Sequence, residues 1–183
     1  MKTPFLAGEK VYLRPLERED APVLLAYIND PDVTRTLTFY RPVSAESVAE
    51  FIAKTGTDRN FVGFGIALKE NDRLIGATDL RIGDYKDRNA LFGISIGAKE
   101  EWNKGYGTEA TRLIVGYGFQ TLNLNRISLR VYEYNPRGVR AYEKAGFKRE
   151  GVLRQEIYRD GRFWDAYVMG ILRSEWDAVG GER

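Results

Sequence analysis

The feature that most constrains the fold is an alternation of strand-like and helix-like segments in the second half of the chain. Residues 90–98 ("ALFGISIGA") and 126–135 ("RISLRVYEYN") are rich in the β-branched and aromatic residues that strands favour. Each is followed by a segment with helical spacing of its apolar residues, at 107–124 and 135–147. Helices in such a run must pack against a sheet, so the sequence predicts an α/β domain.

The ends of the last helix are marked by three residues. Asn135 stands where an N-cap is expected, and Pro136 takes the first helical position. Gly146 follows the last helical residue, where a left-handed backbone conformation is common. These signals predict a helix that begins directly after the strand at 126–135.

The remaining segments predict more strands and helices around this run, with no repeat or linker between them. They are a strand at 10–17, helices at about 20–28 and 44–55 (capped by Ser44, with an apolar stripe of Val48, Phe51 and Ile52), and hairpins over 61–83 and 152–172 that turn at Asn71 and Asp72 and at Asp160 and Gly161. Residues 1–183 are therefore predicted to form a single domain with a mixed sheet.

Composition excludes several kinds of chemistry. The 183 residues include no Cys and no His, which excludes disulfides, cysteine nucleophiles, imidazole bases and the usual zinc ligands. No metal site is expected. The net charge of +2 gives no reason to expect nucleic acid as a partner, and no apolar stretch suggests a membrane span or a secretory signal. A cytoplasmic location is the default expectation.

The stretch "NKGYGTEA" at residues 103–110 predicts an anion-binding turn. Gly105 and Gly107 allow a tight bend that exposes backbone N–H groups at the start of a helix. Two other interpretations fit the same letters: an ordinary surface turn, and the dinucleotide fingerprint G-x-G-x-x-A. The polar residues 98–104 separate the glycines from the preceding strand, which argues against the dinucleotide interpretation.

A second motif, "NPRGVRAYEKAGF", decides among these interpretations. With "WNKGYGTEA" it resembles the GNAT superfamily of acetyl-CoA-dependent N-acetyltransferases. The phosphate loop of that family reads Q/R-x-x-G-x-G/A, and its later helix reads N-x-x-[SA]-x-x-x-Y-x-K-x-G-F. The resemblance covers nearly the whole chain. The flanking segments are similar to the branch that holds ribosomal-protein alanine N-acetyltransferases and spermidine N-acetyltransferases.

This resemblance implies a GNAT fold: a central mixed, mostly antiparallel twisted sheet flanked by helices, with a splayed strand that forms the acetyl-CoA cleft. Tyr142 would lie beside the thioester sulfur as a catalytic acid, although its place on the helix also suits a core residue. The implied cofactor-binding residues are Ser95, Ile96 and Gly97 for the pantetheine arm, Trp102, Asn103, Lys104, Gly105, Tyr106, Gly107 and Thr108 for the pyrophosphate, Asn135 for the cofactor arm, and Lys144 near its phosphate end.

Three residues depart from the family pattern. Trp102 occupies the Q/R position of the phosphate loop, and Gly138 stands where a small or hydroxyl residue is usual. Leu91 stands where this branch commonly has a glutamate that is a candidate general base. Without that base, an α-amine with a pKa near ~7.7–8.0 should react more readily than a polyamine amine near ~10.4, because more of it is uncharged at neutral pH.

Other carboxylates could replace the missing base through water: Asp79, Asp84 or Glu133. The segments expected to line the acceptor cleft, residues 28–42 and 78–89, carry charges of both signs and do not decide the acceptor. We therefore expect direct acetyl transfer from acetyl-CoA to a primary amine, with the N-terminal α-amine of a protein such as a ribosomal protein favoured. A polyamine or other small amine, a non-catalytic acyl-CoA sensor and a homodimer are left open.

Overall fold

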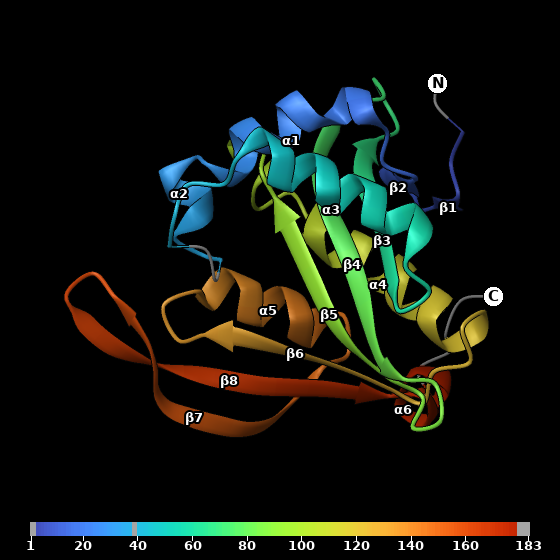
Figure 1. The fold of residues 1–183 in the computed structure, drawn as a ribbon. Helices are drawn as coiled ribbons and strands as arrows, with labels where there is room; N and C mark the ends of the chain where they lie inside the picture. Colours follow the sequence, from blue (N-terminus) through green and yellow to red (C-terminus); the bar gives the residue numbers. More distant parts are fainter. Residues whose placement is uncertain (1–2, 38–39, 179–183) are drawn as a thin grey trace.

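A computed structural model describes residues 3–37 and 40–178 and centres on an eight-stranded sheet (Figure 1). The strand order is β1-β2-β3-β4-β5-β6-β8-β7. Within the described residues, β5 and β6 form the one parallel pair, and the other neighbours are antiparallel. The sheet is therefore mixed and mostly antiparallel, as expected.

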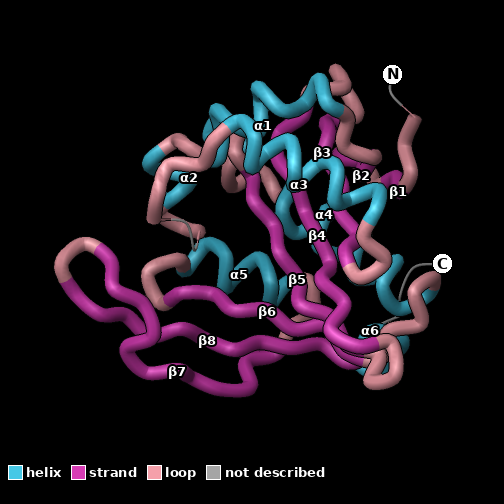
Figure 2. The backbone as a smooth tube through the Cα atoms, in the orientation of Figure 1, coloured by secondary structure: helices cyan, strands magenta, loops and turns pink. Residues whose placement is uncertain are grey.

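The elements follow one another in the order that the sequence pattern predicts for most of the chain (Figure 2). The strands are β1 (Leu6–Ala7), β2 (Val11–Arg14), β3 (Phe61–Leu68), β4 (Leu74–Asp84), β5 (Asn89–Ile96), β6 (Arg126–Tyr132), β7 (Lys148–Arg159) and β8 (Arg162–Leu172). The helices are η1 (Arg18–Asp20), α1 (Ala21–Ile28), α2 (Pro31–Thr34), α3 (Ala45–Thr57), η2 (Lys99–Glu101), α4 (Tyr106–Gln120), α5 (Pro136–Lys144) and α6 (Arg173–Ala178).

Helices cover both faces of the sheet. On one face, α4 buries Ile114 and Phe119 in the larger core, together with Leu80 of β4. On the other face, α1 and α3 pack a smaller core that includes Val48 and Ile52. Because β4 and β5 lie between these two layers, they have a face toward each core.

A splay between β5 and β6 opens the sheet. These strands pair only over residues 89–91 and 126–128. Beyond that point β5 stays paired with β4 up to Ile96, whereas β6 continues along β8 (Figure 1). The two strands diverge into a V whose arms are held by different neighbours, so the expected splayed strand is present.

The predicted helix caps and turns are confirmed at the level of single hydrogen bonds. The side chain of Ser44 accepts from the Ser47 amide at 3.2 Å, and that of Asn135 accepts from the Gly138 amide at 3.0 Å. Gly146 has a φ of 100°, the left-handed conformation expected after a helix. The β7–β8 turn at residues 160–161 also uses positive φ angles, 54° and 81°.

The sequence prediction missed several short elements and misplaced several ends. The elements β1, η1, α2, η2 and α6 were not predicted, the strand predicted at 10–17 ends at Arg14, and β7 begins at Lys148 rather than 152. The helix predicted to run to 124 ends at Gln120, and Asn123 takes a φ of 56°. Pro31 begins α2, and Asp30 caps this helix by accepting from the Asp32 amide at 2.9 Å. Within the described ranges, no helix is long and apolar enough to cross a membrane.

Candidate active site

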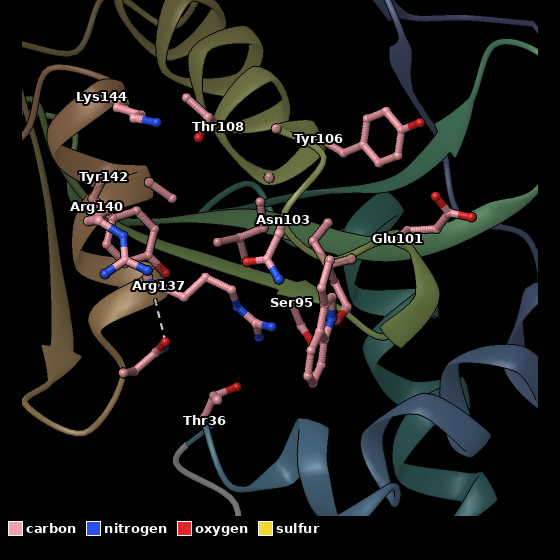
Figure 3. Close-up of a pocket in the computed structure, with 18 residues that line it drawn as sticks. Thr36, Ser95, Glu101, Asn103, Tyr106, Thr108, Arg137, Arg140, Tyr142 and Lys144 are labelled. Atoms are coloured by element: carbon pink, nitrogen blue, oxygen red, sulfur yellow. Dashed lines mark hydrogen bonds between the residues drawn. The ribbon is translucent and has the colours of Figure 1, made fainter.

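A cavity of about 260 Å³ lies at the splay, between β5, the start of α4 and the inner face of α5 (Figure 3). Its lining comes from four stretches of chain, at residues 36, 94–96, 101–108 and 135–144. The lining residues are Thr36, Ile94, Ser95, Ile96, Glu101, Trp102, Asn103, Gly105, Tyr106, Gly107, Thr108, Asn135, Arg137, Gly138, Arg140, Ala141, Tyr142 and Lys144.

The loop before α4 forms an open cradle of backbone groups. Asn103 and Gly105 have φ angles of 65° and 90°, which turn the chain sharply into the helix. A Cβ added at Gly105 would meet no atom of the described protein within 4 Å. Gly105 is also the N-cap of α4, and within the described chain no side chain caps it. The first N–H groups of α4 therefore remain available to an anion.

Three cations on α5 face the same cavity. Arg137, Arg140 and Lys144 are three and four residues apart, so they share one side of the helix (Figure 3). Arg137 lies over the Trp102 ring, with its guanidinium carbon 3.6 Å from the ring centroid. Burial lowers the pKa of Arg137 below its usual value, and no carboxylate among residues 3–37 and 40–178 pairs with it. A half-buried cation without a carboxylate partner favours a bound anion.

The edge of β5 differs from the expected backbone platform. Ser95 and Ile96 line the cavity, but the Ile96 carbonyl accepts from Trp102 Nε1 at 2.7 Å. The Gly97 amide donates to the Ile75 carbonyl at 2.8 Å, and a Cβ on Gly97 would lie 2.1 Å from the Tyr27 ring. Gly97 is therefore placed against α1 rather than in the cavity, and Trp102 occupies one acceptor on the strand.

Tyr142 projects from α5 into the cavity (Figure 3). Its ring meets Phe92 edge-on, with centroids 6.0 Å apart, and Phe147 at 6.2 Å. Burial raises the pKa of Tyr142 to about 12, with Arg137 opposing the rise. The phenol therefore keeps its proton at neutral pH and can donate a hydrogen bond to a group in the cavity. The ring packs in the core and the hydroxyl reaches the cavity, so this position suits both a core residue and the catalytic acid that the family resemblance implies.

Lys104 does not lie where the phosphate-loop pattern places it. Its Nζ pairs with Glu101 at 2.8 Å, and this ion pair raises the pKa of Lys104. Glu101 also binds Arg73 at 2.9 Å. Lys104 is outside the cavity lining, so its charge is directed to a carboxylate of the protein rather than to the cradle.

A pair of substitutions separates these two cations. We expect Arg137→Met to weaken acetyl-CoA binding about fivefold, because Arg137 lines the cavity and has no carboxylate partner. Lys104→Met should change the dissociation constant by less than about threefold, because Lys104 lies outside the cavity lining and is paired with Glu101. Calorimetry on both variants checks the difference, and a larger loss for Lys104→Met would show that the loop lysine binds phosphate.

Two departures from the family motif have local explanations. A Cβ at Gly138 would lie 2.7 Å from Asn135 Nδ2, so the glycine makes room for the Asn135 side chain to fold back as the cap of α5. Leu91 is 40% exposed and stands at the last paired position before the strands diverge. We call the point where β5 and β6 diverge, just beyond Leu91 and Ser128, the fork. A leucine at position 91 leaves the fork without the carboxylate that this position commonly supplies.

The remaining segment that reaches the cavity comes from after α2. Thr36 lines the cavity and lies below Arg137 and Ser95 in the view of Figure 3. The tip of the β7–β8 hairpin holds this segment, because the Arg159 guanidinium donates to the carbonyls of Thr34 at 3.2 Å and Leu37 at 3.1 Å. Arg35 adds an ion pair with Asp160 at 2.7 Å. No local pattern in the sequence connects these two segments.

The structure brings most of the predicted site residues to one cavity. Gly97 and Lys104 are the two that lie outside its lining. Sequence reasoning missed Thr36, Ile94, Glu101, Arg137, Gly138, Arg140 and Ala141 as lining residues. Arg137 and Arg140 could have been found from their helical spacing with Lys144, whereas Thr36 gives no comparable signal.

In the segments expected to line the acceptor cleft, residues 28–42 and 78–89, most carboxylates are paired with nearby cations. Lys99 binds Asp30 at 2.9 Å and Asp32 at 2.7 Å. Asp84 and Glu133, two of the three alternative bases, are exposed at the ends of β4 and β6. Asp79 alone among the three alternatives is buried.

Comparisons with known proteins agree with this geometry. The family model described as "Acetyltransferase (GNAT) domain" matches residues 10–148. The chain is 33% identical over 174 residues to uncharacterized N-acetyltransferase p20 of Bacillus licheniformis, with 93% of this chain and 97% of that protein covered. It is 32% identical over 172 residues to spermidine N(1)-acetyltransferase of Vibrio cholerae, with coverage of 92% and 96%.

The fold is shared as well. The crystal structure of spermidine N-acetyltransferase from Vibrio cholerae in complex with CoA and spermine superposes with a TM-score of 0.82 at 32% identity, covering 91% of this chain and 97% of that one. The open cradle at Gly105 and the three cations of α5 fit the phosphates of CoA. The comparisons favour an enzyme over a non-catalytic sensor. The chain belongs to the GNAT acetyltransferases and is an acetyl-CoA-dependent N-acetyltransferase.

Proposed function

We propose that the chain acetylates a primary amino group of a polyamine such as spermidine. The observation that carries this proposal is the likeness, over nearly the full length of both chains, to a spermidine N-acetyltransferase whose crystal structure holds CoA and spermine. This revises the preference for a protein N-terminus that the sequence suggested. That preference depended on the missing carboxylate at Leu91, and the buried carboxylate of Asp79 weakens the argument.

The proposed roles follow from where the side chains lie. The first turn of α4 and the cations Arg137, Arg140 and Lys144 would hold the phosphates of acetyl-CoA, which when bound supplies the acetyl thioester. Ser95 lies on the diverging strand, where backbone groups would stabilise negative charge that develops on the carbonyl oxygen. The Tyr142 hydroxyl would donate a hydrogen bond to the departing sulfur.

Transfer in a single ternary complex is the proposed order of events. The chain has no Cys and no His to carry an acetyl group in a covalent enzyme intermediate. The splay gives the amine a route to the cavity between β5 and β6, where no strand pairing closes the sheet beyond residues 91 and 128. The amine and acetyl-CoA must therefore be bound together for the acetyl group to pass.

The acceptor is tested by competition at pH 7.4. We expect kcat/KM for spermidine to exceed that for an alanine-initiated peptide by about tenfold or more, because the buried carboxylate of Asp79 would accept the proton of a charged amine. CoA thiol release with each amine, at saturating acetyl-CoA, measures this ratio. A tenfold preference for the peptide would overturn the polyamine proposal and restore the N-terminal amine as the better substrate. A homodimer stays a prediction.

A further inference from the structure

The buried carboxylate of Asp79 lies at the fork of the splayed strands. Asp79 is 7% exposed, and the backbone register sets it beside Gly63 of β3 and Gly93 of β5. A glycine on each side leaves the carboxylate without a flanking side chain on either neighbouring strand. A buried acid between two glycines does not help to pack a core. The acid must be desolvated, and the glycines provide no apolar side-chain contacts.

The carboxylate lies over β5 just beyond the end of its pairing with β6. A Cβ built on Gly93 would be 2.7 Å from Asp79 Oδ2 and 3.1 Å from Oδ1. Gly93 is two residues past Leu91, the last residue of β5 that pairs with β6. Leu91, Gly93 and Ser95 alternate along one face of the strand, and Ser95 lines the cavity. Asp79 is therefore on the face of the fork that also bears Leu91.

Two cations face this carboxylate. Arg81, on the same strand, contacts Asp79 at 3.3 Å, and its side chain is 54% exposed. Lys54 of α3 also lowers the pKa of Asp79, but it is engaged with Asp58 at 3.5 Å. The neighbouring positions on β3 and β5 are glycines and carry no charge. Burial nevertheless dominates and raises the pKa of Asp79.

We propose that Asp79 is the proton acceptor for the amine substrate, and that the Arg81 guanidinium occupies the place that the substrate ammonium takes. The three contacts between Arg81 and Asp79 are each 3.3 Å long. Because the guanidinium is exposed, it can move away from the carboxylate and stay solvated. The fork then presents a carboxylate from β4 in place of the one absent at Leu91 of β5. This assignment rests on the proposed use of a charged primary amine.

The proton balance requires such a group. A primary ammonium loses two protons when its nitrogen forms the amide bond and the thioester C–S bond breaks. One proton goes to Asp79 and then to solvent, and the other neutralises the departing thiolate. At neutral pH a polyamine amine near pKa ~10.4 is uncharged in only about one molecule in a thousand, so little of it can react until the first proton is removed. A carboxylate with a raised pKa is better matched to this transfer than one with an ordinary pKa.

The test replaces the carboxylate by its isostere. We expect Asp79→Asn to lower kcat/KM about a hundredfold at pH 7, measured with whichever primary amine the wild-type enzyme acetylates fastest. The deficit should shrink to less than about tenfold by pH 10, where much of the amine is already uncharged. Asp79→Glu keeps a carboxylate on the same strand and should recover part of the rate that Asp79→Asn loses. Acetyl-CoA affinity should be unchanged in both variants.

Matched controls define the contrary result. Asp84→Asn removes an exposed carboxylate from the same strand and should leave the rate unchanged. A rate for Asp79→Asn within threefold of wild type, or a deficit that stays constant from pH 7 to pH 10 and follows a lower melting temperature, would overturn the assignment and leave Asp79 a structural residue. If the amine that the wild-type enzyme acetylates fastest is not a polyamine, only the proposed acceptor is overturned. The comparison of Asp79 variants is then made with that amine and still tests the role of Asp79.

Discussion

Replacing Tyr142 by phenylalanine is expected to lower kcat about a hundredfold while acetyl-CoA affinity changes by less than a factor of two. The ring keeps its contacts with Phe92 and Phe147, so packing is preserved and only the hydroxyl is lost. The magnitude follows from the loss of a hydrogen-bond donor directed at developing charge, which is typically worth ~10²-fold or more. The measurement is kcat for thiol release at saturating acetyl-CoA and amine.

The raised pKa of Tyr142 limits how the hydroxyl acts. Full proton transfer from a phenol with a pKa of about 12 to a thiolate near ~8.5 is unfavourable. The hydroxyl therefore contributes most as a hydrogen-bond donor to sulfur while the C–S bond breaks, and the thiolate finally takes its proton from solvent. A donor with this pKa stays protonated through pH 10, so Tyr142 should cause no alkaline fall in kcat below that pH.

Tyr117→Phe is the matched control for this substitution. Tyr117 lies on α4, outside the cavity lining, and its side chain packs against Phe5 and Phe64. Burial raises the pKa of Tyr117 as well. The substitution should leave kcat unchanged. A fall of less than threefold for Tyr142→Phe, or equal falls in the two variants, would show that the Tyr142 hydroxyl has no catalytic role.

Local signals in the sequence located the residues whose roles are set by the backbone. Gly105 and Gly146 were recognised because each stands at a helix end, and both adopt the positive φ that such positions favour. Asn135 was recognised as a cap for the same kind of reason. In each case the decisive interaction spans only a few residues, so the letters around the position contain enough information to predict it.

Residues whose roles depend on distant neighbours could not be placed in this way. Gly97 matched the cofactor strand in the motif, but the position of Tyr27 decides that it packs against α1. Lys104 matched the phosphate loop, but Glu101 binds it. Asp79 was one of three candidate bases, and only the register of β3, β4 and β5 shows that glycines flank it at the fork. Strand pairing across the sheet is not encoded in short motifs.

Gly105→Val should weaken acetyl-CoA binding by tenfold to a hundredfold, equivalent to about 1.4–2.8 kcal/mol. A φ of 90° strains a residue with a Cβ, and the strain is greater for a β-branched side chain. In the free protein the loop can relax away from this conformation. Binding of acetyl-CoA must then restore the strained conformation, and the free-energy cost of that strain weakens binding. The added side chain also obstructs the approach to the first N–H groups of α4. Calorimetry with acetyl-CoA measures the effect.

Gly161→Val separates this effect from the general cost of a β-branched residue at positive φ. Gly161 has a φ of 81° and, like Gly105, would place its Cβ in open space, but it lies in the β7–β8 turn outside the cavity lining. Neither variant should lose much thermal stability, because both glycines are exposed and each turn can relax away from the strained conformation in the free protein. Only Gly105→Val should lose affinity for acetyl-CoA. If the two variants bind acetyl-CoA equally well, the glycine loop is an ordinary surface turn and the phosphates must be held by the cations of α5 alone.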